Sequence, residues 1–489
     1  MRQFVALFLL TGFVVAAEQP GITVDWDKTI ARSHTELTIQ VCPEPPLRRG
    51  YPIHDQLWKA LRDMQSNVAR IQFWHPYPRL GVAELEPPHD GVTSWDFSLI
   101  DPLVLDFVAA AEGRPVMLNL STPPQWMYRT PLPIPYPRDP DEITWKYLQS
   151  TELRDPSLKE IVDYYHRVAS WYLKGGFTDE LGKWHASGHH LKIAWWEVLN
   201  EVEQEHDVTP EQYNAVYDAV VEDLHKLDPG LKFSGLALAT PALGAEYIQT
   251  FLNPGKHKPG IPLDMFSYHF YAAGDFDETP EMQQRTFFHM ADKFMATVHY
   301  VESIHRHLSP QTRSFINELG SFSPETSGAN QPIPASYWTL SGSMFAYLYP
   351  QLVREGVDLI GAAELIDYPG QFAGATLVDW VTGRPNARYW VVKLLRDNFG
   401  PGDALVQTGS PSQAVSAQAF VTAKGEKKLL LVNKRDREIA LALPLSANSR
   451  SRLDYVDPTT GFEPPRSTVL TGNLVTLRPQ GVAVVTLQP

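Results

Sequence analysis

The sequence of 489 residues contains one cysteine, Cys42, so no disulfide can form within the chain. A chain of this length can bury enough apolar surface to be stable without one. Basic residues are also few, with 42 Lys and Arg against 56 Asp and Glu, which gives a formal net charge of −14. That balance argues against DNA, RNA or a strongly anionic polymer as the main ligand.

A long hydrophobic run occurs only at the N-terminus. Residues 1–17 (MRQFVALFLLTGFVVAA) combine Arg2 with an apolar stretch, and Val15 and Ala17 lie at positions that suit signal peptidase. This pattern predicts a secretory signal peptide cleaved before Glu18, and therefore a secreted or periplasmic protein. A membrane anchor is the alternative, but the stretch is shorter than the roughly 20 residues that span a bilayer. No later segment is long and apolar enough to predict a membrane span.

From about residue 41 onward, short apolar runs alternate with segments of helical periodicity. Eight of the runs are candidate strands: 41–47, 68–74, 114–120, 192–201, 232–241, 263–271, 313–321 and 358–367. Eight strand–helix units that close on themselves form a (β/α)8 barrel, also called a TIM barrel. A doubly wound open sheet is the competing fold, but no Gly-rich phosphate loop follows any of these strands.

The pattern changes near residue 399. Residues 399–489 contain short strands separated by turn residues, without a helical period, and this predicts a C-terminal β-sandwich. We expect the barrel to span residues 46–398. The strands within 18–45 (GITVDW and ELTIQV) are expected to pair with the sandwich sheet or to cover the base of the barrel.

Two glutamates end predicted strands of the barrel. Glu201 follows Asn200 in WWEVLNE, and Glu318 lies in FINELG, 117 residues later. Barrel active sites lie at the C-terminal ends of the strands, and hydrolysis of a glycosidic bond requires two carboxyl groups. Strict alternation would place Asn200 and Glu201 on opposite faces, so both can reach a cleft only if the strand is bulged or already turning.

Other polar and aromatic residues also stand near predicted strand ends. Arg70 is a plausible counter-charge for an ionised carboxylate, and Glu197 is expected to be structural, paired with Arg70 or a lysine. Glu203 and Glu205 are expected to be solvated loop charges, and they are the fallback acids if Glu201 is inert. Glu364 could contact a sugar hydroxyl or form a salt bridge inside the barrel. The remaining candidates near strand ends are Trp74, His75, Ser121, Trp126, His269, Tyr271 and Asp367.

Five motifs occur in an order that resembles glycoside hydrolase family 39, the β-xylosidase and α-L-iduronidase family of the retaining (β/α)8 glycosidases. They are WHPYP, WWEVLNE, MFSYHFY, FINELG and NARYWVVKLLRDNFG. The resemblance implies that Glu201 is the general acid/base and Glu318 the nucleophile, and that Asn200 binds the sugar 2-hydroxyl. It further implies that His269 or Tyr271 orients the nucleophile, and that the sugar subsite is shaped by His75, Trp126 and Arg70.

The sequence therefore predicts an exported, retaining glycosidase that acts on an oligosaccharide or polysaccharide without a metal or other cofactor. An exo-acting, β-xylosidase-like enzyme is the first expectation. An endo-acting enzyme, an arabinosidase or uronidase of the same clan, and an inert carbohydrate-binding protein are the alternatives. A lyase or transglycosylase could use the same carboxylates.

Overall fold

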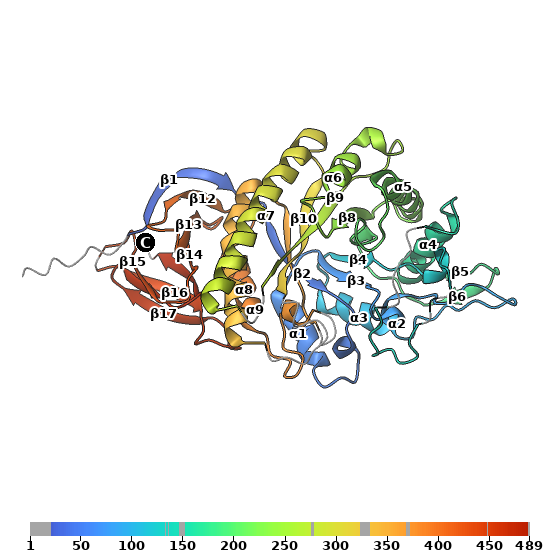
Figure 1. The fold of residues 1–489 in the computed structure, drawn as a ribbon, viewed down its shortest axis with the longest axis horizontal. Coiled ribbons are helices and arrows are strands. Elements are labelled where there is room, and N and C mark those ends of the chain that lie inside the picture. The colour runs from blue at the N-terminus through green and yellow to red at the C-terminus, as the bar shows by residue number, and fades with distance from the viewer. Residues whose placement is uncertain are drawn as a thin grey trace, which may run out of the picture.

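The computed structural model describes residues 21–487, apart from 133, 135, 146–151, 275–277, 323–332, 368–371 and 447. Eight parallel strands close into a barrel, and a sheet of mainly antiparallel strands forms a second domain beside it (Figure 1). This confirms the predicted TIM barrel with an appended C-terminal β-sandwich. The predicted signal peptide, residues 1–17, lies outside the described residues.

The barrel strands follow one another around the barrel in chain order. They are β2 (Glu36–Val41), β3 (Ala69–Gln72), β4 (Val116–Leu120), β7 (Trp195–Val198), β8 (Lys232–Leu238), β9 (Met265–Ala273), β10 (Arg313–Phe322) and β11 (Leu359–Ala362). The helices are α1 (His54–Met64), α2 (Pro78–Gly81), α3 (Ile100–Ala110), α4 (Lys159–Leu173), α5 (Pro210–Leu227), α6 (Ala245–Phe251), α7 (Pro280–Leu308), α8 (Ala335–Glu355) and α9 (Ala387–Asn398). A small hairpin of β5 (Gly176–Thr178) and β6 (Trp184–Ala186) follows α4.

Two helices show how the local sequence sets their first residue. Thr209 caps α5, because its side chain accepts from the backbone of Gln212 while the Gln212 side chain accepts from the backbone of Thr209. Asn386 caps α9 by accepting from the two backbone amides of Arg388 and Tyr389. These caps satisfy backbone donors that have no partner inside the helix.

The first barrel strand differs from the expectation. The segment ELTIQV was expected beside the sandwich or at the barrel base, yet it forms β2, which pairs with β3 and β11 in the barrel wall. The barrel therefore begins before residue 46. The strand also lies earlier than the predicted 41–47, because Pro43, Pro45 and Pro46 cannot donate hydrogen bonds to a sheet.

The barrel interior is apolar at one end and polar toward the other, and every second residue of a strand contributes to it. An inner layer is formed by Val68, Met117, Trp195, Met265, Phe315 and Leu359. Two residues further along three of these strands, the inward side chains are Asn119, Glu197 and Asn317, all completely buried. The polar end is the C-terminal end of the strands, where barrel enzymes place their active sites.

The second domain packs a large sheet against a small one. The large sheet runs in the order β1 (Thr23–Arg32), β12 (Ala404–Gly409), β13 (Val415–Val421), β14 (Lys427–Asn433), β19 (Val482–Leu487), β16 (Arg450–Val456) and β17 (Arg466–Thr471). The small sheet pairs β15 (Ile439–Ala442) with β18 (Leu474–Leu477). Pairing of β1 with β12 joins the N-terminal segment to this domain.

Both faces of β14, a central strand of the large sheet, are buried. Leu429 and Leu431 on β14 face the core of the sandwich, whereas Leu430 and Val432 belong to the core that contains the barrel helices. The helices α8 and α9 lie between the barrel and this sheet (Figure 1). The apolar contact across both faces of β14 makes the sandwich a support for the barrel.

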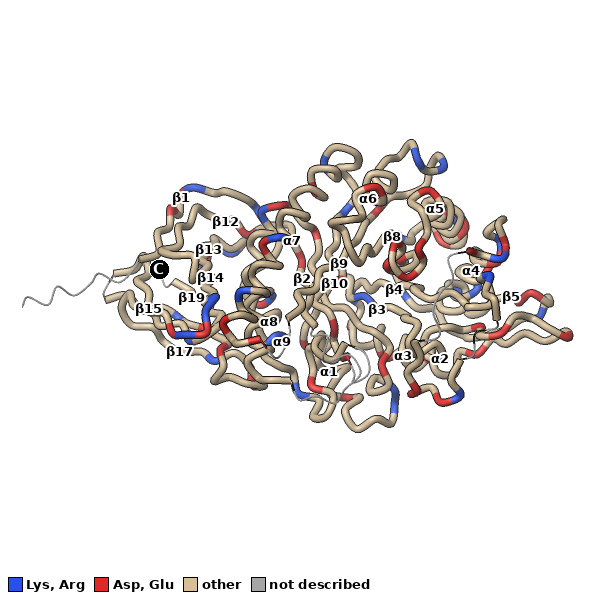
Figure 2. Tube along the Cα trace, viewed as in Figure 1, with Lys and Arg blue, Asp and Glu red and all other residues tan. Residues whose placement is uncertain are grey.

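Charge and hydropathy of the described residues agree with the sequence. In Figure 2 the basic positions are scattered over both domains and do not gather on one side. No helix within the described ranges has the length and hydropathy to cross a bilayer.

Candidate active site

The chain turns immediately after β7, which brings two consecutive side chains into one cleft. The strand ends at Val198, and Leu199 and Glu201 have φ angles of 59° and 43°, in the left-handed region that is uncommon for residues other than glycine. Asn119 fixes this turn by donating to the carbonyl oxygen of Leu199 at 2.8 Å. Asn200 and Glu201 both line the cavity. The turn thus gives two consecutive side chains access to one cleft, which a regular strand would not.

A bulge has the same effect on β10. The register between β10 and β9 shifts between Ile316 and Glu318, so one extra residue is inserted at this point. Asn317 points inward to Glu197, at 3.2 Å, and because of the bulge Glu318 also points inward and lines the cavity. Both catalytic candidates thus depend on local departures from regular strand geometry.

Arg70 connects the barrel floor to Glu318. Its Nη1 donates to Glu318 Oε1 at 2.8 Å and its Nε donates to Glu197 Oε2 at 2.5 Å. Its Nη2 donates to Asn200 Oδ1 at 2.7 Å, and the Asn200 side chain is also hydrogen-bonded to Glu205. Burial alone would lower the pKa of Arg70, but the charges of Glu197 and Glu318 outweigh it and raise that pKa. The expected counter-charge is therefore in contact with Glu318.

Glu197 lies beneath the site and does not line the cavity. Its carboxylate is completely buried and accepts from four side chains besides Arg70: Asn119, Ser234, Ser267 and Asn317. Every oxygen of this carboxylate is hydrogen-bonded, as a buried charge requires. The expectation of a structural residue paired with Arg70 agrees with this position.

Glu201 and Glu318 face each other across His269. The Nδ1 atom of His269 is 3.0 Å from Glu201 Oε1 and 3.4 Å from Glu318 Oε2. One oxygen from each carboxylate and a ring nitrogen of His269 all lie within 4.8 Å of one another. Glu201 is the more accessible, with 17% of its side chain exposed against 5% for Glu318.

The surroundings of Glu318 favour its ionised form. Burial alone would raise the pKa of Glu318, but the nearby charges of His269 and Arg70 outweigh burial and lower it. Tyr271 adds to this by donating from its hydroxyl to Glu318 Oε2 at 2.8 Å. Burial would lower the pKa of His269, yet Glu318 and Glu201 raise it. The result is a deprotonated carboxylate that accepts from Arg70 and Tyr271 and lies beside the charge of His269, the state that a nucleophile needs.

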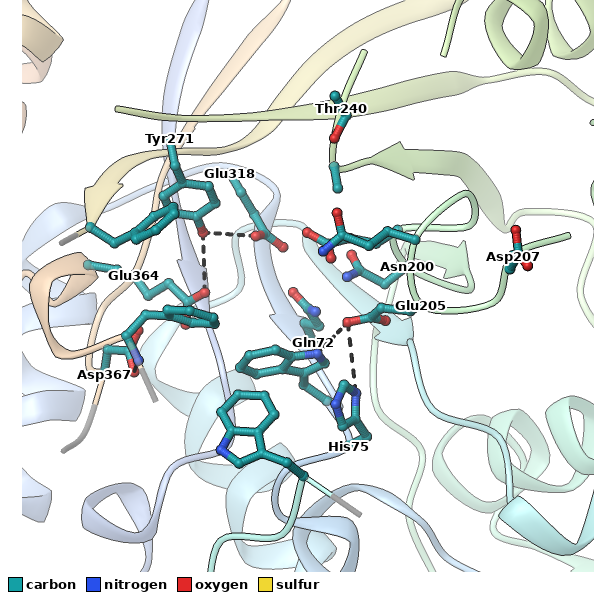
Figure 3. Close-up of a pocket in the computed structure, with 18 residues that line it drawn as sticks. Gln72, His75, Asn200, Glu205, Asp207, Thr240, Tyr271, Glu318, Glu364 and Asp367 are labelled. Carbon is teal, nitrogen blue, oxygen red and sulfur yellow. Dashed lines mark hydrogen bonds and ion pairs between the residues drawn. The ribbon is translucent and has the colours of Figure 1, made fainter. Parts of the chain in front are cut away.

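The site opens into a cavity of about 610 Å³ at the C-terminal ends of the strands (Figure 3). Its aromatic lining comes from Trp74, Trp145, Tyr271, Phe322 and Phe372. Polar lining residues include Gln72, His75, Thr240 and Asp367. None of the described lining residues is Lys or Arg. Aromatic faces beside convergent hydrogen-bonding groups are typical of sites for small polar ligands such as sugars.

Arg70 and His269 lie beneath the described residues that line the cavity, in contact with the carboxylates, whereas Trp126 lies elsewhere. It is not among the described residues that line the cavity. Its indole nitrogen donates to the carbonyl oxygen of Glu84 at 2.9 Å, and the guanidinium of Arg154 lies 4.4 Å from its ring centre. Trp126 packs the loop, and Trp74 and Trp145 supply aromatic surface to the cavity in its place.

Glu205 lies in the site, although the sequence placed it in a solvated loop and gave it only the role of a fallback acid. Expected to be a solvated loop charge, it is 7% exposed and lines the cavity. Trp74 donates to its Oε1 and Ser121 to its Oε2 at 3.4 Å. Burial and the charge of Glu201 raise the pKa of Glu205 well above its ordinary value. Glu203 also differs from the expectation, because it accepts from the backbone amide of Thr240 and one of its oxygens is buried.

His75 lies next to Glu205, with its Nδ1 atom 3.8 Å from Glu205 Oε1. Burial and the neighbouring His206 lower the pKa of His75 to about 3, so its ring is neutral. Both ring nitrogens are buried without a hydrogen-bond partner in the structure. A neutral imidazole has one donor and one acceptor to offer, which suits a ligand hydroxyl.

Comparisons with known proteins agree with this geometry at the level of fold. No protein-family model and no curated protein sequence matches the chain. Solved structures do. A glucosidase from Croceicoccus marinus has a TM-score of 0.60 at 14% identity, over 96% of this chain and 99% of that one. An α-L-arabinofuranosidase from Thermotoga maritima has a TM-score of 0.63 at 12% identity, over 96% of this chain and 100% of that one.

A monomeric β-xylosidase from Caulobacter crescentus CB15 is similar over 96% of this chain and 99% of its own, with a TM-score of 0.59 at 16% identity. The fold is one that glycoside hydrolases use. Identity this low shows the architecture shared over both domains, and it does not single out family 39.

Proposed function

We propose that the protein is a retaining glycoside hydrolase in which Glu318 is the nucleophile and Glu201 the general acid/base. The observation that carries the proposal is the spacing of the two carboxylates, which have oxygens within 4.8 Å of each other. The close approach of these oxygens favours the retaining arrangement, whose carboxyl groups lie about 5–5.5 Å apart, over the inverting one, whose separation of about 6.5–9.5 Å admits a water.

Each step then has a group to perform it. Glu318 attacks the anomeric carbon C1 as Glu201 protonates the departing glycosidic oxygen, so the C1–oxygen bond breaks and a glycosyl ester forms on Glu318. Glu201, now a carboxylate, takes a proton from water, whose oxygen attacks C1 and releases Glu318. The greater exposure of Glu201 suits its contact with the leaving group and with water.

Other residues bind the sugar in this proposal. Asn200, fixed by Arg70, presents its amide nitrogen to the 2-hydroxyl, and His75 offers a neutral ring to a further hydroxyl. Trp74 and Trp145 provide apolar faces for the sugar ring. We propose an exo-acting, β-xylosidase-like activity on an oligosaccharide or polysaccharide, by an exported protein. The cavity lining, which among its described residues has no basic side chain, favours an uncharged sugar over a uronate.

Release of nitrophenol from a panel of aryl glycosides tests the proposal, with Glu201→Gln and Glu318→Ala alongside the wild type. We expect hydrolysis of one neutral glycoside, and a loss of several orders of magnitude in kcat in Glu318→Ala. Glu201→Gln should lose more activity on substrates with poor leaving groups than on those with good ones. Sugar binding by calorimetry with no turnover on any substrate would contradict it and support the inert binding protein.

A further inference from the structure

The hydroxyl of Tyr271 lies between two carboxyl groups. It is 2.8 Å from Glu318 Oε2 and 3.4 Å from Glu364 Oε1 (Figure 3). A phenol has one proton, so it can donate to only one of them. The shorter distance and the ionised state of Glu318 assign that proton to the nucleophile. A hydrogen bond between Tyr271 and Glu364 then requires Glu364 to be the donor.

The surroundings of Glu364 supply the missing proton. Glu364 follows β11, is 7% exposed, and lines the cavity. Burial and the charges of Asp367 and Glu318 raise its pKa well above the ordinary value for glutamate. An ionised Glu364 would place a second negative charge beside the nucleophile and would compete for the proton of Tyr271. As a carboxylic acid it does neither.

The single cysteine extends this arrangement away from the cavity. Cys42 is completely buried and shares a hydrogen bond with the side chain of Glu364. Burial raises the pKa of the Cys42 thiol well above its ordinary value, so the thiol keeps its proton and donates. The side-chain amide of Gln40 donates in turn to Cys42 Sγ at 3.6 Å. One chain of four donors thus ends at Glu318. Its members are Gln40 on β2, Cys42 just after β2, Glu364 just after β11 and Tyr271 on β9.

We propose that Glu364 is a positioning residue that acts as a carboxylic acid, donating to the oxygen of Tyr271 so that Tyr271 donates to the nucleophilic oxygen pair of Glu318. The proposal rests on the role given to Glu318 under the proposed function. Its chemistry is a fixed order of donors, Gln40 to Cys42 to Glu364 to Tyr271 to Glu318, and no proton leaves its atom during the reaction. Glu364 thereby holds the nucleophile in one orientation without adding charge to the site.

Infrared difference spectroscopy tests the protonation directly and needs no activity. A protonated carboxylic acid has a carbonyl stretch distinct from that of a carboxylate. We expect such a signal in the wild type at neutral pH, its loss in Glu364→Gln, and a shift of its frequency in Tyr271→Phe, which removes the hydroxyl that accepts from it. Glu205→Gln is the matched control, since it should remove a separate carboxylic-acid signal and leave that of Glu364 in place. Persistence of the full signal in Glu364→Gln would overturn the inference.

Kinetics test the positioning role. A glycoside with a dinitrophenol leaving group needs little acid assistance, so its pH profile reports Glu318 and the groups around it. The charged and titratable groups that face Glu364 are Cys42, Arg70, Tyr271, Glu318, Asp367 and Arg388. We expect wild-type kcat/KM to fall at high pH as Glu364 ionises, and this fall to be absent in Glu364→Gln, whose amide still donates.

Glu364→Leu removes the donor while keeping the volume. It should lower kcat by roughly 10- to 100-fold more than Glu364→Gln does, because a misplaced reacting group costs about that much. Equal losses in the two variants, or an unchanged alkaline limb in Glu364→Gln, would overturn the positioning role. Failure of the wild type on every glycoside would instead count against the proposed function, and the infrared comparison would still decide the donor chain.

Discussion

Arg70 Nη1 lies 2.8 Å from Glu318 Oε1 at the centre of the barrel, and neither side chain has more than 5% of its surface exposed. The same guanidinium also binds Glu197, so one cation pairs with two buried carboxylates. A lysine could not replace it, because a single ammonium cannot contact both in fixed directions. Folding of the barrel floor and ionisation of the proposed nucleophile therefore depend on the same residue.

Replacement of Arg70 should lower both the free energy of unfolding and the activity. Arg70→Met leaves two carboxylates buried without their cation, and removal of one partner of a buried ion pair costs about 3–5 kcal/mol. Denaturant unfolding measures the loss. Arg49→Met is the matched control, since Arg49 pairs with Asp106 while 55% exposed, and exposed pairs contribute about 0–1 kcal/mol. Equal stability of the two variants would contradict the account of the barrel floor.

His269 should set the acid limb of the pH profile. Its charge helps to lower the pKa of Glu318, so the wild-type nucleophile stays ionised, and active, as the pH falls below the ordinary range for glutamate. His269→Asn removes that charge and raises the pKa of Glu318. The acid limb of kcat/KM on a dinitrophenyl glycoside should consequently move to higher pH.

His75 provides the comparison for this shift. Because its pKa is lowered to about 3, it carries no charge over most of the acid limb, and His75→Asn should leave the position of that limb unchanged. The same variant should raise KM if His75 binds a sugar hydroxyl. Equal shifts of the limb in both variants would show that charge at His269 is not the cause.

Substitution of two tryptophans distinguishes ring contact with the sugar from packing outside the cavity. Trp145 is 38% exposed and lines the cavity, in edge contact with Trp74 at 5.6 Å between ring centres. Trp145→Ala should raise KM by roughly 2- to 10-fold, as expected for loss of about 0.5–1.5 kcal/mol of ring contact. Trp126→Ala should leave KM unchanged and lower thermal stability instead, because Trp126 packs against Arg154. A larger KM effect in Trp126→Ala would reverse this assignment.

Dialysis against a chelator should leave activity unchanged. Glu201, His269 and Glu318 are close enough to hold a cation, but Arg70 and Tyr271 already donate to the two oxygens of Glu318. Positive charge at the nucleophile thus comes from side chains. Activity that disappears with chelation and returns with one divalent ion would show that these three residues bind a metal.

The sequence predicted the barrel because each strand is a short apolar run, and both its length and the turn residues that flank it differ from those of the helices. It also located Glu201 and Glu318, since the rule that barrel sites lie at strand ends needs only the ends of the strands. No sequence pattern locates the left-handed turn at Leu199 or the bulge before Glu318. Both are fixed by contacts from other strands, such as that between Asn119 and Leu199.

Glu205 and Trp126 show where the sequence misleads. Glu205 lies in a run of charged residues that reads as a solvated loop, and its burial comes from Trp74 and Ser121, which follow other strands. Trp126 follows β4 and was predicted to be a subsite residue, yet Arg154 covers its ring. In each case the deciding contact is with a residue distant in sequence.

The most direct test of the central proposal is to trap the glycosyl intermediate. A 2-deoxy-2-fluoro glycoside with a dinitrophenol leaving group forms the ester quickly and hydrolyses it slowly, because the fluorine destabilises the oxocarbenium-like transition states. Peptide mass spectrometry of the inactivated enzyme should then show one added sugar on the peptide that contains Glu318, and none in Glu318→Ala. A label on Glu201, Glu205 or Glu364, or turnover of the parent glycoside with inversion and no label, would contradict the assignment of Glu318 as the nucleophile.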